Sequence, residues 1–196
     1  MTRVVLVDAG GANIGSVRHA LRRLGADASL ASDADEIRAA THVILPGVGA
    51  AAPGMRRLRE SGLIGVVRGL TQPVLGVCLG MQLLFEYSEE GDTKCLDVLP
   101  GRLCRFDDTA VRVPHMGWNA LRMERSSSLF SGIHAGAYAY FVHSYAAPVG
   151  ACTLASCDYG GAFSAAVQRE NFNGVQFHPE RSADVGARLL ANFLAL

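Results

Sequence analysis

A lone cysteine, Cys78, is the residue of this sequence best placed to act as a nucleophile. It lies in VLGVCLGMQ at positions 74–82, where an apolar run changes into helix-forming residues, with Gly76 and Gly80 two positions to either side. This is the nucleophile-elbow pattern with cysteine in place of serine, in which a strand bends sharply into a helix. The unpaired N–H groups of a helix N-terminus favour a thiolate, and the N–H of Leu79 would face a developing oxyanion. On these residues alone, a small buried hydrophobic cysteine is an equally good explanation.

A histidine and a glutamate two residues apart could supply the base that a catalytic thiol needs. They are His178 and Glu180 in GVQFHPERS at 174–182, with Pro179 between them. We expect Pro179 to hold the segment extended, so that the two side chains share a face. The histidine would then move the proton, and the carboxylate would fix its tautomer. In isolation, a surface pair at a strand end is the better explanation, but an elbow cysteine in the same chain reverses that preference.

The glycine-rich segment ILPGVGAAAPG, residues 44–54, predicts a strand followed by a flexible turn. An ordinary turn before a helix is the commonest role of such a loop. Its small residues would equally allow the backbone N–H of Val48 to approach the oxyanion from a second side. The segment lacks the lysine and the spacing of a phosphate-binding loop, and DAGGAN at 8–13 resembles a nucleotide loop still more weakly.

Other polar residues compete with these for a role. His143, in YFVHSY, could act as the base, but no carboxylate lies two residues away, so a histidine of the core or of a pocket wall is the better interpretation. His115, in PHMGWN, precedes the only tryptophan and indicates a wall or an interface. Glu89 and Glu90 are most simply solvated charges, although either could meet an amino group. No ligand spacing supports a metal site, and we expect no cofactor.

A sheet must position these residues, because β-branched runs alternate with helical stretches over the first half of the chain. This order predicts an α/β fold with a mostly parallel sheet flanked by helices, whose active site collects at the carboxyl ends of the strands. The expected strands are 3–7, 28–30, 41–46 and 73–77. The expected helices are 14–25, 34–40, 54–70 and 79–87.

From about residue 100 the pattern changes to short strands separated by turn residues, which we interpret as a mixed or antiparallel extension of the same sheet. The expected strands are 101–106, 111–114, 138–146, 152–156, 163–168 and 174–177. A final helix over 182–196 carries apolar residues at 185, 189, 190, 193 and 194, which predicts a stripe facing the core. Because no linker or repeat interrupts the chain, we expect one domain over 1–196.

The composition excludes several classes of partner. Lys plus Arg and Asp plus Glu both number 18, so the formal net charge is zero, and neither nucleic acid nor anionic lipid is an expected partner. No apolar stretch approaches the roughly 20 residues that span a bilayer, and the N-terminus does not suit a secretory signal, which favours a cytoplasmic protein. The five cysteines never form a C-x-x-C pair, which argues against a disulfide framework and a zinc site.

Taken together, these motifs resemble the class I glutamine amidotransferases, a flavodoxin-like family with an elbow cysteine and a later H-P-E. The similarity runs nearly from end to end and is closest to the branch that forms glutaminase subunits of imidazole glycerol phosphate synthase, in histidine biosynthesis. The matching segments are LPGVG, GVCLGMQLLFE, LPGRL, VPHMGWN, YFVHSY and GVQFHPERS. PHMGWN and FVHSY discriminate this branch, since related amidotransferases share the elbow and H-P-E only.

The resemblance implies hydrolysis of glutamine to glutamate and ammonia through a thioester on Cys78, with His178 as base and then acid and Glu180 orienting it. It also implies two backbone oxyanion donors and a set of contacts in the glutamine pocket. The donors are Leu79 and Val48, and the pocket contacts are Gly49, Gln82, Glu90, Ser144 and Tyr145. The ammonia would pass to a cyclase subunit with a (βα)8 barrel fold. Such a barrel typically needs about 250 residues, so the cyclase must be a separate chain in a heterodimer.

The sequence departs from the family at two places. The family usually has D-Y-G-x-G-N where this chain has DAGGAN, so Ala9 and Ala12 replace a tyrosine and a glycine. Arg181 follows H-P-E where lysine is usual. Asn13 and Arg181 are expected at the partner interface, so the departures would affect docking rather than hydrolysis.

Two other functions stay open at this point. A stand-alone cysteine hydrolase or peptidase on the same fold is the alternative, since the elbow and its base serve any acyl transfer. A non-catalytic relative used for binding is a third, which the intact Cys, His and Glu disfavour.

Overall fold

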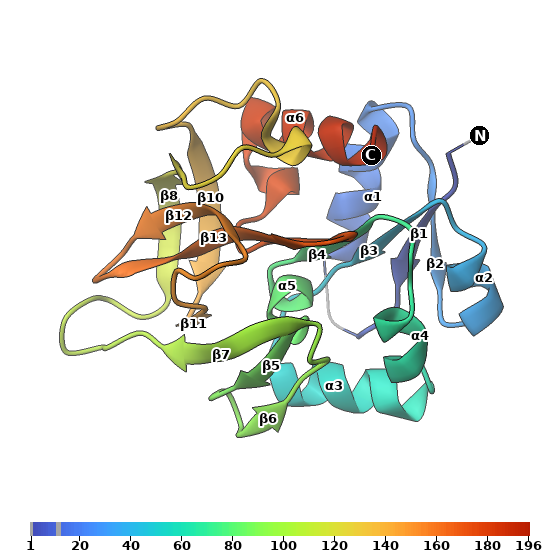
Figure 1. The fold of residues 1–196 in the computed structure, drawn as a ribbon, viewed down its shortest axis with the longest axis horizontal. Helices are drawn as coiled ribbons and strands as arrows, with labels where there is room; N and C mark the ends of the chain where they lie inside the picture. Colours follow the sequence, from blue (N-terminus) through green and yellow to red (C-terminus); the bar gives the residue numbers. More distant parts are fainter. Residues whose placement is uncertain (1, 11–12) are drawn as a thin grey trace.

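The computed structural model describes residues 2–10 and 13–196, and an eight-stranded sheet runs through its centre (Figure 1). The strand order is β2-β1-β3-β4-β14-β13-β12-β9. The strands are β1 (Val4–Val7), β2 (Ala28–Ala31), β3 (His42–Leu45), β4 (Val74–Val77), β9 (Arg122–Met123), β12 (Thr153–Asp158), β13 (Ala162–Arg169) and β14 (Phe172–Val175). The five strands from β2 to β14 are parallel, and β13, β12 and β9 continue the sheet antiparallel. The predicted α/β fold with an antiparallel extension is confirmed.

Helices cover both faces of this sheet. Successive side chains of a strand point to opposite faces, and because both sets are apolar in the parallel strands, each face needs a covering layer. Val5 and Val7 of β1 pack on the side of α2, α3, α4 and α5, and Val4 and Leu6 pack on the side of α1 and α6. The helices are α1 (Ile14–Arg23), α2 (Ala34–Arg38), α3 (Ala51–Glu60), α4 (Ile64–Arg68), α5 (Leu79–Leu83) and α6 (Ala183–Leu194), with single 3₁₀ turns η1 (Ser128–Phe130) and η2 (Pro179–Arg181). None of the helices within the described residues is long and apolar enough to cross a membrane.

Part of the second half leaves the main sheet, which corrects the expectation of one continuous extension. Residues 101–106 and 138–146 contribute instead to two small sheets, one two-stranded and one four-stranded. The first pairs β8 (His115–Ala120) with β10 (Tyr138–His143); the second contains β5 (Phe85–Ser88), β6 (Thr93–Lys94), β7 (Leu99–Arg105) and β11 (Tyr145–Ala146). Strand β8 is absent from the sequence prediction, whereas the expected strand 111–114 does not form.

Two helix predictions are also wrong in extent. The single helix expected over 54–70 is divided into α3 and α4, because Gly62 takes a left-handed φ of 68° between them. The helix expected over 79–87 ends at Leu83, and Phe85–Ser88 forms β5 instead. Pairing of β5 with β6 and β7 therefore overrides the local helical preference.

The final helix forms as predicted and lies against the 3₁₀ turn that follows β14. Leu189, Leu190 and Phe193 of α6 are buried in the core. At Gly186 the helix approaches η2 so closely that a Cβ atom would lie 1.8 Å from the carbonyl oxygen of Pro179. This contact fixes the position of the turn that carries Glu180.

Candidate active site

Cys78 occupies a strained bend between β4 and α5. Its φ of 51° and ψ of −107° lie outside the regions that most side chains adopt, a conformation that must be held by its surroundings. The two flanking glycines, Gly76 and Gly80, leave room for the backbone at this bend. A Cβ on Gly80 would lie 1.6 Å from the Leu45 carbonyl oxygen, and one on Gly76 would lie 2.6 Å from the Met81 nitrogen. Any side chain at either position would prevent the bend.

The segment that carries the histidine reaches Cys78 because β14 lies beside β4. Val175 pairs with Val77, and the N–H of Cys78 donates to the Val175 carbonyl at 2.8 Å. Three residues later, His178 Nδ1 lies 2.8 Å from Glu180 Oε1, so the expected pair forms. The expected reason is wrong, because Pro179 does not extend the chain but begins the 3₁₀ turn η2. The turn folds Glu180 back toward the ring of His178.

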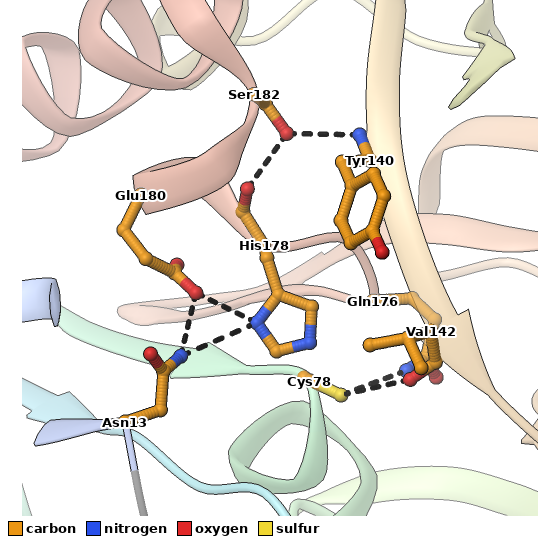
Figure 2. A network of polar contacts seen from close by, with 8 residues as sticks. All are labelled: Asn13, Cys78, Tyr140, Val142, Gln176, His178, Glu180 and Ser182. Carbon is orange, nitrogen blue, oxygen red and sulfur yellow. Dashed lines mark hydrogen bonds and ion pairs between the residues drawn. The ribbon is translucent and has the colours of Figure 1, made fainter. Parts of the chain in front are cut away.

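Hydrogen bonds from Ser182 and β10 fix this turn (Figure 2). Ser182 Oγ donates to the His178 carbonyl at 2.7 Å and accepts the N–H of Tyr140 at 3.0 Å. The N–H of His178 donates to the Tyr140 carbonyl at 2.9 Å. Hydrogen bonds at both its N–H and its carbonyl therefore hold the backbone of His178, independently of the contacts of its side chain.

Asn13 completes the polar set around Glu180. Its Nδ2 donates to Glu180 Oε1 at 2.6 Å and lies 3.5 Å from His178 Nδ1. Burial would raise the pKa of Glu180, but the hydrogen bonds from His178 and Asn13 hold it below its usual range. Burial likewise opposes a charge on His178, yet the neighbouring Cys78 and the Glu180 carboxylate raise the pKa of this histidine to about 10. The site thus favours an imidazolium held by a carboxylate.

The second ring nitrogen of His178 is directed toward Cys78. Figure 2 shows the ring oriented with Nε2 on the side of Cys78, and this buried nitrogen has no hydrogen-bond partner within the described residues. The sulfur itself contacts the Val142 carbonyl at 3.9 Å and Gln176 Nε2 at 3.6 Å. A proton can therefore pass between Nε2 and a group bound at the sulfur, which is the geometry of a base that serves a thiol nucleophile.

A cavity of about 300 Å³ lies over the sulfur. Beside Cys78, it brings together every residue expected at the oxyanion or in the substrate pocket: Val48, Gly49, Leu79, Gln82, Glu90, Ser144 and Tyr145. The N–H groups of Val48 and Leu79 have no protein acceptor in the described part of the chain, so they remain available to a bound group. One carboxylate oxygen of Glu90 already accepts the N–H of Ala51 at 2.8 Å, which leaves the other oxygen for a ligand.

His143 is a wall of this cavity and not a competing base, as the sequence indicated. Its Nδ1 lies 2.9 Å from the Tyr145 carbonyl and its Nε2 lies 3.1 Å from His115 Nδ1. Since a carbonyl only accepts, His143 donates from Nδ1 and accepts at Nε2, so both of its nitrogens are occupied. Burial lowers the pKa of His143 to about 3 and that of His115 to about 4, so both are neutral at pH 7.

The residues expected at the partner interface divide into two groups. Arg181 is exposed on η2. Asn13 is only partly exposed and its amide is committed to Glu180, so it belongs to the polar network of the site. Ala9 is buried, and Ala12 lies outside the described residues. No group of three or more His, Cys, Asp and Glu side chains within residues 2–10 and 13–196 could hold a metal ion.

Sequence reasoning missed the contacts of Asn13 and Gln176, as well as Pro114 and Val142 in the cavity wall. Gln176 had a usable signal, because it lies two residues before His178 at the end of a strand, where alternate side chains share a face. Asn13 had none, since it is far from Glu180 in the sequence and only the fold brings them together.

Comparison with known proteins gives a consistent result over the whole chain. The model of the family described as glutamine amidotransferase class-I matches residues 5–196. A protein of Xanthomonas euvesicatoria pv. vesicatoria (strain 85-10), named imidazole glycerol phosphate synthase subunit HisH, is 58% identical over 100% of this chain and 98% of its own length. A protein of the same name from Xylella fastidiosa (strain Temecula1) is 55% identical over the same shares of both chains.

Solved structures share the fold at low sequence identity. A structure described as a glutamine amidotransferase has a TM-score of 0.75 at 22% identity, covering 97% of both chains. The structure of PurLQS from Thermotoga maritima has a TM-score of 0.72 at 18% identity, covering 99% of this chain and 98% of that one. At such identities the likeness concerns the fold alone.

Proposed function

Because this chain belongs to the class I glutamine amidotransferase family, we propose that it is a glutaminase subunit of imidazole glycerol phosphate synthase that hydrolyses glutamine with Cys78 as nucleophile. The observation that carries the proposal is the pair of Glu180 and His178, whose Nε2 lies on the side of Cys78, while Cys78 itself lines the cavity. Identities of 55 to 58% with proteins of that name, over the full chain, support the choice of branch.

The first half of the reaction makes a thioester. The Cys78 thiolate attacks the γ-amide carbon of glutamine, and the carbonyl oxygen takes up the charge beside the N–H groups of Val48 and Leu79. As the C–N bond breaks, His178 gives its Nε2 proton to the departing nitrogen, which leaves as ammonia. The Glu180 carboxylate holds the imidazole in the orientation that this transfer needs.

The second half returns the enzyme to its starting state. Now neutral, His178 takes a proton from water while the water oxygen attacks the thioester carbon. The C–S bond breaks, glutamate leaves, and the thiolate faces the imidazolium again. The free oxygen atoms of Gln82 and Glu90 are suited to bind the ammonium group of the substrate, because the Gln82 amide nitrogen is already engaged by the Tyr145 carbonyl.

The ammonia is consumed by a separate cyclase subunit, for which we retain a (βα)8 barrel fold. Ammonia released into water would be protonated and lost as a nucleophile, so the two active sites must meet at a sheltered interface. An exposed apolar face on the β8–β10 ribbon suits this role, with Met116 63% exposed, Trp118 52% and Tyr138 58%. The ribbon adjoins the site, because Tyr140 of β10 binds the turn that carries His178. Exposed aromatic residues of this kind are common in interface cores.

The test is glutamate release from glutamine by the full chain, alone and with a cyclase subunit of a related organism. We expect turnover that rises when the cyclase binds. A peptidase would cleave peptides and leave free glutamine intact, and a binding protein would turn over neither.

A second measurement isolates the nucleophile. In the complex, Cys78→Ala should abolish glutamine-dependent synthesis and retain synthesis from free ammonium, because the two reactions lie on different chains. More than trace glutaminase activity in that variant would remove Cys78 from its proposed role.

A further inference from the structure

Gln176 is a buried amide with no part in the reaction described above. It follows β14 directly, its exposed fraction is 0%, and its Nε2 lies 3.6 Å from Cys78 Sγ (Figure 2). Its Oε1 lies 3.0 Å from Gln82 Nε2, and Gln82 Nε2 in turn lies 3.0 Å from the Tyr145 carbonyl oxygen. A short chain of hydrogen bonds therefore runs from a backbone carbonyl to the reacting sulfur.

The direction of this chain is fixed by its first member. A carbonyl can only accept, so Gln82 must present its NH₂ group to Tyr145. The second hydrogen of that NH₂ group then points to Gln176, which must accept it with its side-chain oxygen Oε1. Gln176 is left with its NH₂ group toward Cys78, because an amide cannot present an acceptor on both sides. The sulfur thus receives a donor whose orientation is set by two other buried groups.

The surroundings of the sulfur suit two protonation states. As a thiol, Cys78 can donate weakly to the Val142 carbonyl at 3.9 Å. As a thiolate it needs donors, and Gln176 Nε2 at 3.6 Å is the only side-chain amide in contact with it among the described residues. A hydrogen bond to the charged form of a group favours that form. The titratable groups around the sulfur are His178, which is paired with Glu180, and three residues of the cavity wall, Glu90, His143 and Tyr145.

We propose that Gln176 is a catalytic residue that donates a hydrogen bond to the Cys78 thiolate and is locked in that orientation by Gln82 and the Tyr145 carbonyl. The inference rests on Cys78 as the nucleophile. Gln176 stabilises the thiolate before substrate arrives, so it sets the population of the reactive form. Its N–H also competes with the acyl carbon of the substrate for the electrons of the sulfur. Its contribution is separate from that of His178, because it transfers no proton.

The first test is the pH dependence of alkylation of Cys78 by iodoacetamide, read at this residue by mass spectrometry of the full chain. Gln176→Met keeps the volume and removes the donor. Hydrogen bonds to charged groups are stronger than those between neutral groups, but the N–S distance is long, so we expect about tenfold slower alkylation at pH 7 and an alkylation midpoint raised by about one pH unit. Cys95 and Cys157 serve as internal references, because burial raises their pKa values to about 11 and about 12.

Two further variants separate a specific role from general damage. Gln176→Glu keeps the acceptor for Gln82 and turns a negative oxygen toward the sulfur, so it should slow alkylation more than Gln176→Met does. Asn173→Leu removes another buried amide of β14, whose Nδ2 donates only to backbone carbonyls, and should lower stability without moving the alkylation midpoint. Folded Gln176 variants that alkylate Cys78 at the unaltered rate would overturn the proposal.

The wild-type chain decides the matter if neither variant folds. In a ¹⁵N-labelled sample, the side-chain amide protons of Gln176 should shift with pH in step with Cys78 alkylation, and this shift should vanish in Cys78→Ala. A Gln176 amide indifferent to pH would refute the hydrogen bond. Glutamine turnover by Cys78→Ala would instead refute the nucleophile, so the two failures are distinguishable.

Discussion

The side-chain amide of Asn13 donates at 2.6 Å to Glu180 Oε1, the same oxygen that lies 2.8 Å from His178 Nδ1. The other oxygen of Glu180 is buried and has no partner within the described residues. One oxygen therefore carries both contacts that orient the carboxylate. Asn13 is itself held in a left-handed conformation with a φ of 83°, one residue before α1 begins.

Removing the Asn13 amide should impair catalysis without removing any group that transfers a proton. Asn13→Ala leaves Glu180 with His178 as its sole partner, so we expect kcat to fall about tenfold while KM for glutamine stays nearly constant. Steady-state glutaminase assays of the complex measure this. Ser16→Ala, on the exposed side of the same helix, is the matched control. An unchanged kcat in Asn13→Ala would show that the turn alone positions Glu180.

The nucleophile bend should tolerate no side chain at position 80. A Cβ in Gly80→Ala would meet the Leu45 carbonyl at 1.6 Å, so one of two packed segments must move, and we expect a loss of several kcal/mol in the free energy of unfolding. Gly65→Ala is the control, because nothing lies within 4 Å of its Cβ in α4 and alanine there should gain roughly 0.5–1 kcal/mol. Chemical denaturation of both variants tests the contrast, and equal effects would contradict it.

The free energy of unfolding should decrease as the pH falls, because buried histidines of the folded chain resist protonation. In the folded chain burial lowers the pKa of His143 from 6.5 to about 3, so between these values the unfolded chain binds a proton that the folded chain does not. The free energy of unfolding therefore decreases as the pH falls from about 6.5, by about 2 kcal/mol for this residue at pH 5. His143→Gln should flatten the slope, and His19→Gln, at an exposed position, should leave it unchanged. Urea unfolding at several pH values measures it; identical slopes in all three chains would contradict the assignment.

The β8–β10 face should carry much of the affinity for the cyclase. Trp118→Ala removes a large exposed aromatic at the centre of that face, and we expect binding to weaken by about 2 kcal/mol or more, roughly 30-fold. Leu30→Ala is the control, because Leu30 is 43% exposed on β2 at the opposite edge of the main sheet. Titration calorimetry with the cyclase gives both values. If Trp118→Ala binds as the unaltered chain does, the partner docks elsewhere.

The parallel half of the fold was predictable because its signals are local. Runs such as Val4–Val7 and Val74–Val77 are buried on both faces and are apolar without interruption. The bend at Cys78 was predicted from the glycines at 76 and 80, although these residues alone left a small buried cysteine as an equally good explanation. The small sheets were not predictable, because β5 and β8 are strands only through the partners that they find elsewhere in the chain.

The polar site was predictable in its members and less so in its arrangement. His178 and Glu180 pair as expected, but through a turn that begins at Pro179, where proline suits the first position of a helical turn as well as it suits an extended chain. Asn13 lies beside Glu180 because α1 contacts η2, and no sequence pattern within either segment predicts that contact.

The position of β14 between β4 and β13 affects how the main sheet can form while the chain is being synthesised. A ribosome releases β4, which ends at Val77, long before β14, which begins at Phe172. During that interval the strand leading to the nucleophile has an open edge on one side, where unpaired backbone groups could accept a strand from another chain. If Cys78 and His178 act as proposed, the nascent chain cannot hydrolyse glutamine in this period, because His178 follows the missing strand. Ammonia production therefore begins only when the sheet is closed, and the period before closure is when the chain is most exposed to aggregation.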